Sequence, residues 1–358
     1  MYKKFFMGIA AMAALTLVSC SSDDLNSLSD NSSKNEAISF DGYLGRSAVA
    51  VNGSRGSVLD LNALKGENGG FGVFGHYSSA DGATPTYGEN LFKNEKVTYS
   101  SSNSTSTKWA YTNTKYWPTV GHIDFLAYAP FDNSKTLSGT KIDFTVSPTV
   151  KEQKDLLWAN AANKTKKDNP VKFTFNHALS RLGYTVKLND DYTGTIITLN
   201  KITLAGSNNG TKKAFYSAGT IDLSYTPSTT SPSTTSLWSP STSEEKLNFD
   251  WVPTNKTLST TETKNSDAEY LFVIPQDFSQ KTTSADALYV VVKYTISYSD
   301  HTTMETTVYQ QLKQEFKQGK AYTINLTIGL TPIDFDAEVT PWTDTDNTNT
   351  DIDINTWN

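Results

Sequence analysis

The sequence holds a single cysteine, Cys20, and very little arginine. One cysteine cannot form a disulfide within the chain, and it excludes zinc sites built from several cysteines. The three arginines, Arg46, Arg55 and Arg181, stand among 31 basic residues, so an arginine-specific protease would have few places to cut. The formal net charge of -6 is spread along the chain without a basic block. Nucleic acid is therefore not an expected partner.

Motifs that carry catalysis or bind metal are also scarce. The histidines stand far apart and form no H-E-x-x-H pair, so core or surface positions are favoured over a zinc site. They are His76, His122, His177 and His301. Neither a G-x-S-x-G motif nor a phosphate-binding glycine loop is present, whereas paired carboxylates for glycoside hydrolysis stay open because they need only meet in the fold. We expect no enzyme, no catalytic residue, no cofactor and no metal.

The C-terminus is crowded with aspartate and asparagine between residues 344 and 353. This segment lacks the glycine and the glutamate of an EF-hand calcium loop at their required positions. A solvated tail or a strand with an outward polar face is therefore favoured over a calcium site.

The N-terminus has the pattern of a secretory signal. Lys3 and Lys4 precede the uncharged run 5–18, which is shorter than the roughly 18 or more apolar residues of a membrane span. Leu17-Val18-Ser19-Cys20 resembles a bacterial lipobox, in which the cysteine becomes the acylated first residue. This predicts a signal peptide over 1–19 and a membrane anchor through lipid on Cys20. The polar segment 20–36 predicts a flexible tether.

Most of the remaining chain alternates apolar and polar residues in short segments, with almost no helical periodicity. Expected strands include 37–43, 71–77, 123–129, 142–146, 171–175, 182–188, 195–204, 270–275, 288–296 and 333–339, and the segment 316–328 predicts a turn and a long strand. The segment 155–159 fits a strand or a single helical turn, and the Ser/Thr/Pro-rich segment 226–243 predicts an exposed loop or insertion. The pattern predicts an all-β fold of two β-sandwich domains, 37–178 and 179–358.

Tryptophan leaves two interpretations open. Trp109, Trp238 and Trp251 could stack on sugars if they were exposed. Aromatic residues at these frequencies more often belong to a hydrophobic core, and that interpretation is favoured.

Several features occur together in one order. They are the lipobox, the strand before Arg46, the block from Tyr116-Trp117-Pro118 to Tyr128-Ala129-Pro130, the junction His177-Ala178-Leu179-Ser180, and the ending with Gly319, Tyr322 and Trp342. In this combination the chain resembles the fimbrillin (Mfa-like) family of Bacteroidota type V pili. The resemblance implies two transthyretin-like β-sandwich domains, export as a lipoprotein, removal of the N-terminal segment by a protease, and assembly by strand exchange.

The resemblance gives these features roles. It implies a pilus subunit at the outer membrane and cell surface that acts in adhesion, with other pilin subunits and ligands on host or bacterial surfaces as partners. An arginine-specific protease would cut between Arg46 and Ser47, with Arg55 as runner-up, and remove the strand 37–43. Alternating apolar residues near the C-terminus are the donor-strand candidates: Ile333, Phe335 and Val339, or Ile352 and Ile354. A monomeric surface lipoprotein that binds glycans is the alternative function.

Overall fold

The computed structural model describes residues 36–44, 59, 61–67, 69–80, 84–100, 108–226, 236–253, 256–266, 269–280, 287–330 and 334–341. The expected signal peptide, Cys20, Arg46, Arg55 and the chain after residue 341 lie outside these ranges. Within them, no helix is long and apolar enough to cross a membrane. The expected all-β class is confirmed, because helix in the described ranges is confined to α2 (Leu61–Lys65) and two 3-10 turns, Val150–Glu152 and Lys166–Asp168.

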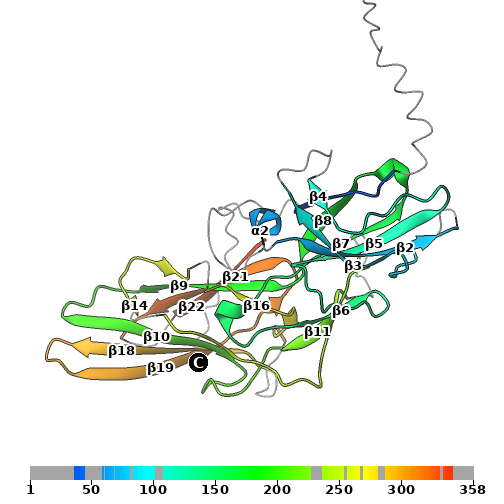
Figure 1. Ribbon diagram of the computed structural model, residues 1–358. Coiled ribbons are helices and arrows are strands. Elements are labelled where there is room, and N and C mark those ends of the chain that lie inside the picture. The colour runs from blue at the N-terminus through cyan, green and yellow to red at the C-terminus, as the bar shows by residue number, and fades with distance from the viewer. Residues whose placement is uncertain are drawn as a thin grey trace, which may run out of the picture.

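Strands of the first half close into a ring, at one end of the molecule in Figure 1. The eight strands of this half are β1 (Phe40–Leu44), β2 (Phe71–Ser78), β3 (Phe92–Tyr99), β4 (Trp109–Ala110), β5 (His122–Ala129), β6 (Lys141–Thr145), β7 (Leu157–Lys164) and β8 (Val171–His177). The order around the ring is β1-β4-β3-β2-β5-β7-β8, and β6 lies outside it. Neighbours are antiparallel except β1 and β8, which run parallel.

The ring encloses a core that is rich in phenylalanine. In β8 buried and exposed residues alternate strictly, so Val171, Phe173 and Phe175 point inward, as the sequence pattern predicts. They pack with Phe40, Phe71 and other apolar side chains from the remaining strands. Burial of so much aromatic surface is the main favourable term that holds the ring closed.

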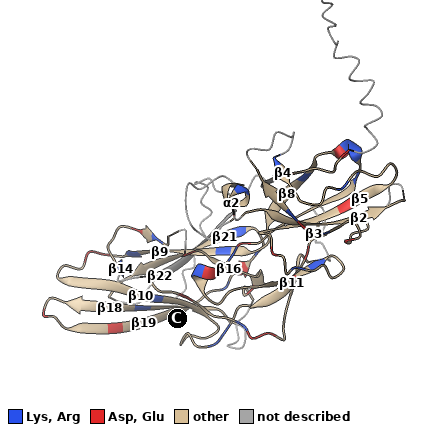
Figure 2. Cartoon of the chain, in the orientation of Figure 1, with Lys and Arg blue, Asp and Glu red and all other residues tan. Residues whose placement is uncertain are grey.

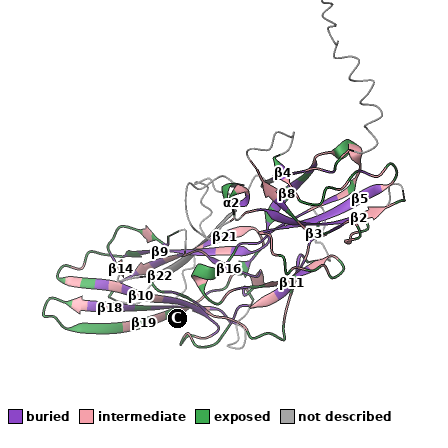
Figure 3. Cartoon of the chain, viewed as in Figure 1, coloured by how far each residue is buried: buried purple, intermediate pink, exposed green. Residues whose placement is uncertain are grey.

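β5 is buried on both of its faces, which Figure 3 shows as continuous purple. Phe125 and Ala127 face the core inside the ring. Leu126 and Tyr128 belong to a second core, which extends into the other half of the chain. The sequence predicts one buried aromatic face for this strand, whereas the fold uses β5 as a wall between two cores.

The second half contributes fourteen strands to the described structure. They are β9 (Ser180–Leu188), β10 (Thr195–Ala205), β11 (Ala218–Asp222), β12 (Trp238–Pro240), β13 (Phe249–Trp251), β14 (Lys256–Thr257), β15 (Thr263–Lys264), β16 (Leu271–Val273), β17 (Gln276–Asp277), β18 (Tyr289–Tyr298), β19 (Thr303–Gln311), β20 (Glu315–Phe316), β21 (Lys320–Ile328) and β22 (Asp334–Pro341). One sheet has the order β15-β9-β21-β22 and another β13-β10-β18-β19. Residues of both sheets meet in the second core.

The two halves share a small sheet. β6 leaves the ring and pairs with β11, which pairs with β12 on its other edge. The first half therefore supplies a strand to a sheet whose other members belong to the second half. The domain boundary between residues 178 and 179 stays a prediction.

Most expected strands appear close to their predicted positions, and residues 157–159 of the segment 155–159 become the start of strand β7. Residues 227–235 of the predicted exposed loop or insertion 226–243 lie outside the described residues, whereas part of the described remainder differs from the prediction. Within it, Leu237 and Trp238 are buried, and β12 pairs with β11. Their two large apolar side chains outweigh the loop-like composition around them.

Candidate functional site: the groove that holds the first strand

β1 fills a gap in the ring between β4 and β8. Five consecutive Cα pairs join β1 to β8, from Phe40 opposite Val171 to Leu44 opposite Phe175. On the other edge, Phe40 pairs with Trp109 of β4, and Ala37 forms an isolated bridge with Tyr116. The backbone of this segment is therefore paired on both edges, and it can be exchanged only for another extended strand.

Phe40 lies in a box of four aromatic rings. Its ring centroid is 5.5 Å from those of Phe92, Tyr111 and Phe125, and 5.7 Å from that of Phe173. The side chain is fully buried. Removing a phenylalanine from such a site costs about 3–5 kcal/mol. The box is therefore a strong binding subsite for one aromatic side chain of an inserted strand.

The two flanking inward positions have different requirements. Ile38 is almost fully buried in the same core. At Gly42 an added Cβ would lie 3.2 Å from Phe71 Cε1, which is tighter than an ordinary contact, and 3.5 Å from Phe175 Cε2, which is an ordinary contact. The groove thus accepts a large apolar residue, an aromatic residue and a very small residue at every second position.

Asn169 fastens the start of the inserted segment from the loop between β7 and β8. Its Oδ1 accepts hydrogen bonds from the amide and the hydroxyl of Ser39, both at 2.9 Å. Its Nδ2 donates to Glu36 Oε1 at 2.7 Å and to the carbonyl of Ala37 at 3.1 Å. Two of these four bonds go to main-chain atoms and are independent of the side chains of the inserted strand.

Tyr111 fastens the same segment from the other side. Its hydroxyl donates to the carbonyl of Ile38 at 2.8 Å and accepts from the amide of Lys115 at 3.1 Å. Burial raises the pKa of Tyr111 above its usual value, and nearby Glu95 adds to the rise. The hydroxyl therefore stays a donor over the physiological pH range.

Some of the predicted site residues lie within the described structure and others lie outside it. Arg46 and Ser47 follow the end of β1 at Leu44 by two and three positions, outside the described residues, as do Cys20 and Arg55. Phe335 and Val339 lie in β22, where they are the Cα partners of Leu326 and Tyr322. Ile333, Ile352 and Ile354 lie outside the described residues.

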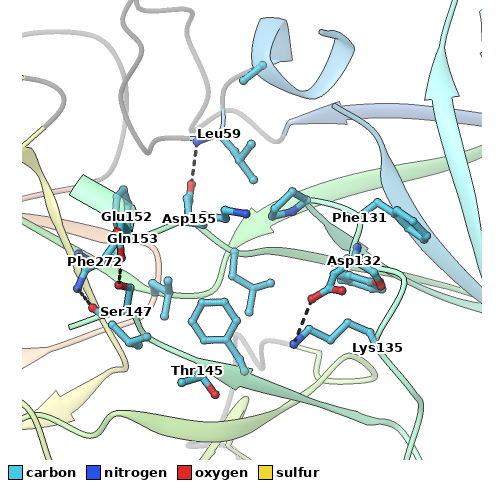
Figure 4. A pocket seen from close by; sticks show the side chains of 18 of the residues that line it. Leu59, Phe131, Asp132, Lys135, Thr145, Ser147, Glu152, Gln153, Asp155 and Phe272 are labelled. Atoms are coloured by element: carbon cyan, nitrogen blue, oxygen red, sulfur yellow. Dashed lines mark hydrogen bonds and ion pairs between the residues drawn. The ribbon is translucent and has the colours of Figure 1, made fainter. Parts of the chain in front are cut away.

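A second candidate site is a cavity of about 920 Å³ beside α2. Figure 4 shows Phe131 and Asp132 on one side of it, with Lys135 3.7 Å from Asp132, and Leu59 and Asp155 on another side. Aromatic and charged groups together could hold a small polar ligand. If the glycan-binding alternative were correct, this cavity would suit it.

Asp155 is fully buried at this cavity and joins the segment before α2 to the end of β8. Its Oδ2 accepts a hydrogen bond from the amide of Leu59 at 3.2 Å and lies 2.7 Å from His177 Nδ1, whereas its Oδ1 has no partner among the described residues. His122 forms a similar buried pair with Asp124 at 3.2 Å. Both histidines are therefore core residues, the interpretation that the sequence favours.

The sugar-stacking hypothesis for the three tryptophans is wrong. Trp109, Trp238 and Trp251 are at most 5% exposed. The Nε1 of Trp238 donates to the carbonyl of Ala178, and that of Trp251 to the carbonyl of Glu269, both at 2.7 Å. Each ring is therefore part of a core and out of reach of a sugar.

Charge and metal-binding groups give no competing site in the described part of the chain. Figure 2 shows acidic and basic residues dispersed over both ends without a continuous stripe of either sign. No cluster of three or more His, Cys, Asp or Glu side chains suited to a metal ion occurs among the described residues. The groove of β1 is thus the feature with the most specific geometry.

Comparison with known proteins gives matches over nearly the whole chain. The profile of a protein family described as "Fimbrillin-like" matches residues 63–342. The chain is 27% identical over 398 aligned positions to fimbrium subunit Fim1C of Phocaeicola vulgatus, with 97% of this chain and 98% of that protein covered.

Two solved structures of candidate cell adhesion proteins are also similar. The one from Bacteroides ovatus has a TM-score of 0.48 and 18% identity, with 87% of this chain and 99% of that chain covered. The one from Bacteroides uniformis has a TM-score of 0.47 and 17% identity, with 86% and 99% covered.

Proposed function

The chain belongs to the fimbrillin-like family, and from this premise we propose that it is a fimbrial subunit whose first strand is a removable plug. The plug is the segment 36–44, which contains β1. Cleavage after Arg46 would separate it from the body, and a strand from the C-terminal part of another subunit would then take its place. The mature subunit would begin at Ser47 and assemble on the cell surface.

The observation that carries this proposal is the position of β1 in the chain and in the ring. It is the first described strand, it inserts between β4 and β8, and it ends two residues before Arg46. A cut at that point breaks none of the strands described in the ring. It leaves the plug bound only through non-covalent contacts, so that another strand can compete for the groove.

Loss of the plug would make the ring unstable unless a strand replaces it. The facing edges of β4 and β8 would carry unpaired backbone groups, and the four-ring box around Phe40 would be empty. An open strand edge beside an apolar groove is a ready template for strand addition. Removal of the plug therefore favours polymerisation.

The N-terminal signal peptide and lipobox pattern would direct the protein to the cell surface. Lipid on Cys20 would hold the precursor at the outer membrane, where an arginine-specific protease and other subunits are its partners. In this role the protein contributes adhesion to host or bacterial surfaces and no enzymatic step. Arg55 remains the second choice for the cleavage position.

The test uses purified Cys20→Ser protein, which carries no lipid, treated with an arginine-specific protease. We expect a new N-terminus at Ser47 and a ladder of oligomers by native electrophoresis. Arg46→Lys should block both changes, whereas the matched control Arg55→Lys should block neither. Arg181, the remaining arginine, is half-buried in β9 with its guanidinium 4.4 Å from the centre of the Tyr270 ring.

Cleaved protein that stays monomeric at high concentration would contradict the proposal. A new N-terminus at Gly56 with oligomers would move the cleavage to Arg55. The glycan-binding alternative predicts instead a monomer that migrates more slowly in gels containing polysaccharide, with the shift lost in Phe131→Ala.

A further inference from the structure

β19 is an edge strand whose outer side pairs with no strand in the described part of the chain. It ends the sheet order β13-β10-β18-β19, far from the ring (Figure 1). Its nine residues pair with β18 at consecutive positions without a register shift, so the edge is long and regular. The opposite edge of this sheet carries only the three residues of β13 and the two of β14. The long open edge of the sheet is therefore β19.

The hydrogen bonds to β18 show which residues of β19 face the open side. At the two ends of the ladder, the amide of Tyr298 donates to the carbonyl of Thr302 at 2.9 Å, and the amide of Leu312 to that of Leu288 at 2.8 Å. Hydrogen-bonded and non-bonded pairs alternate along an antiparallel ladder, so the even-numbered residues of β19 bond to β18. The odd-numbered residues turn their N–H and C=O groups outward: Thr303, Glu305, Thr307, Tyr309 and Gln311.

This edge lacks the features that prevent strand addition in natural sheets. Those features are proline, lysine, a bulge or a very short strand, and β19 has none of them. Its one charge, on Glu305, lies 2.9 Å from Lys293 Nζ of β18, so the edge has no uncompensated charge. None of its residues is buried, and Figure 3 shows much of the strand as exposed. Another strand can therefore add to β19.

The side chains of β19 are complementary to a second, antiparallel copy of the same strand. When Thr307 lies opposite Thr307 of the other copy, no two like charges face each other. The ring of Tyr309 is 53% exposed, and its hydroxyl can donate to the carboxylate of Glu305 across the contact. The facing residues in this register are Thr303 and Gln311, Met304 and Gln310, Glu305 and Tyr309, and Thr306 and Val308.

Other registers are less favourable. With Glu305 on the two-fold axis, two carboxylates would lie directly opposite each other, and like charges in that position destabilise a sheet. If odd-numbered residues faced even-numbered ones, the outward N–H and C=O groups would meet groups that already bond to β18. Only with Thr307 on the axis do all five outward-facing residues find partners within the strand.

We propose that β19 joins two copies of this chain side by side, antiparallel and with Thr307 on the two-fold axis. The two sheets then become one, with the order β10-β18-β19-β19-β18-β10 through both copies. Such a contact is isologous, the commonest arrangement between identical chains. Its use between assembled fimbriae rests on the proposed function, whereas the pairing itself needs no cleavage.

A single β19 contact is weak, because it adds a short backbone ladder and buries few side chains. An isolated pair of strands is only marginally stable in water, so the precursor stays monomeric at ordinary concentrations. A fimbria repeats the same edge in every subunit. Linked weak contacts strengthen one another through effective concentration, so we expect assembled fimbriae to associate laterally.

Disulfide trapping in uncleaved protein tests the register. In a Cys20→Ser background, the thiol of Thr307→Cys is the only one in the chain. Across the axis the two Cα atoms at position 307 would lie about 5.5 Å apart, within the range for a disulfide. Mild oxidation at high protein concentration should give linked dimers on non-reducing electrophoresis. The matched control Thr303→Cys is also exposed but faces Gln311, and it should give none.

A mixture of tagged Glu305→Cys and untagged Tyr309→Cys chains should form mixed dimers, although neither chain links to itself. Equal linking by Thr307→Cys and Thr303→Cys would indicate random collision and overturn the proposal, as would the absence of linked Thr307→Cys dimers. Glu305→Cys chains that link to themselves would overturn the register.

Blocking variants test the lateral contact between polymers. Thr307→Pro removes an outward N–H that β18 does not use, and proline is tolerated at such a position of an edge strand. Thr307→Lys is a second block, because two ammonium groups would meet on the axis. Circular dichroism melting checks that both variants fold. After arginine-specific cleavage both should form polymers that stay single in electron micrographs, whereas polymers of the parent chain and of the control Thr307→Val should lie side by side.

Two outcomes of this experiment would overturn the lateral role of β19. They are single polymers of the parent chain, and side-by-side polymers of a folded blocking variant at the parent's frequency. A cleaved parent chain that does not polymerise would instead contradict the proposed function. Trapping of uncleaved Thr307→Cys chains measures the β19 contact independently of that result.

Discussion

Tyr128 joins the shared strand β5 to the loop that follows it. Its hydroxyl donates to the carbonyl of Asp132 at 2.7 Å and lies 2.8 Å from Asn94 Oδ1. Burial raises the pKa of Tyr128 to about 12, because the charged phenolate would lose its hydration. The folded state therefore holds this proton more tightly than the unfolded chain, whose tyrosine titrates near pH 10.

The sign of the pH dependence follows from this difference. The contribution of Tyr128 is fully present below about pH 10 and is lost as the pH rises towards 12. Tyr128→Phe should lower the free energy of unfolding by about 1 kcal/mol at pH 8, from the lost hydrogen bonds. Its stability should fall less steeply than that of the parent chain between pH 10 and 12, as measured by urea unfolding.

Tyr116→Phe is the matched control, because its ring is 55% exposed and its hydroxyl contributes little to folding. It should have the same free energy of unfolding as the parent chain at pH 8. Tyr87 and Tyr322 also have pKa values raised to about 12 by burial. The free energy of unfolding of Tyr128→Phe should therefore still fall between pH 10 and 12, but less steeply than that of the parent chain. Identical slopes for Tyr128→Phe and the parent chain would show that this phenol is equally acidic in both states.

At the scale of elements, the alternation of apolar and polar residues predicts where most strands lie, but it does not predict which strands pair in a sheet. β8 and β1 show one apolar face each, and the sequence locates both faces correctly. The parallel pairing of β1 with β8 joins residues about 130 positions apart in the chain, and no local pattern reports it. The second buried face of β5 is missed for the same reason, because the residues that cover it come from distant segments.

Asn169 shows the same limit for a single site residue. Its role depends on contacts with residues 36, 37 and 39, and an asparagine before a proline in a loop gives no signal of them. β12 is missed because Ser, Thr and Pro dominate the letters around Trp238. By contrast, the inward set of Ile38, Phe40 and Gly42 follows directly from alternation.

Asn169→Ala should weaken retention of the plug. The substitution removes both the acceptor for the Ser39 amide and the donor to the Ala37 carbonyl, and each part-buried group left unpaired costs about 1–3 kcal/mol. After cleavage at Arg46, the plug should dissociate about tenfold faster for each 1.4 kcal/mol lost. Release of a fluorescently labelled plug fragment measures the rate.

Asn176→Ala is the matched control for this experiment. Asn176 is exposed at the end of β8, and its Nδ2 bonds only locally, to the carbonyl of Thr174 at 3.1 Å. Its plug should leave at the parent rate. Equal release rates from Asn169→Ala and Asn176→Ala would mean that the aromatic box alone retains the plug.

At the scale of the whole molecule, the lipid site and the plug belong to one fragment. Cys20 and the segment 36–44 both precede Arg46, whereas the rest of the ring and all of the second half follow it. A single cut at Arg46 would therefore separate the body from its anchor and from its plug. The proposed cleavage thus couples release from the membrane to competence for assembly.

This coupling predicts opposite behaviour for two variants. Arg46→Lys should keep its fatty-acid label, stay in the membrane fraction and remain monomeric, because anchor and plug are both retained. Cys20→Ser should lose the label and the membrane pool, yet its purified form should still polymerise after cleavage, because the plug and Arg46 are intact. Metabolic labelling with palmitate, membrane fractionation and native electrophoresis measure these properties, with Ser21→Ala as a control that should match the parent chain. Polymers formed by uncleaved Arg46→Lys protein would show that assembly does not require removal of the plug. Palmitate label on Cys20→Ser protein would place the lipid on another residue.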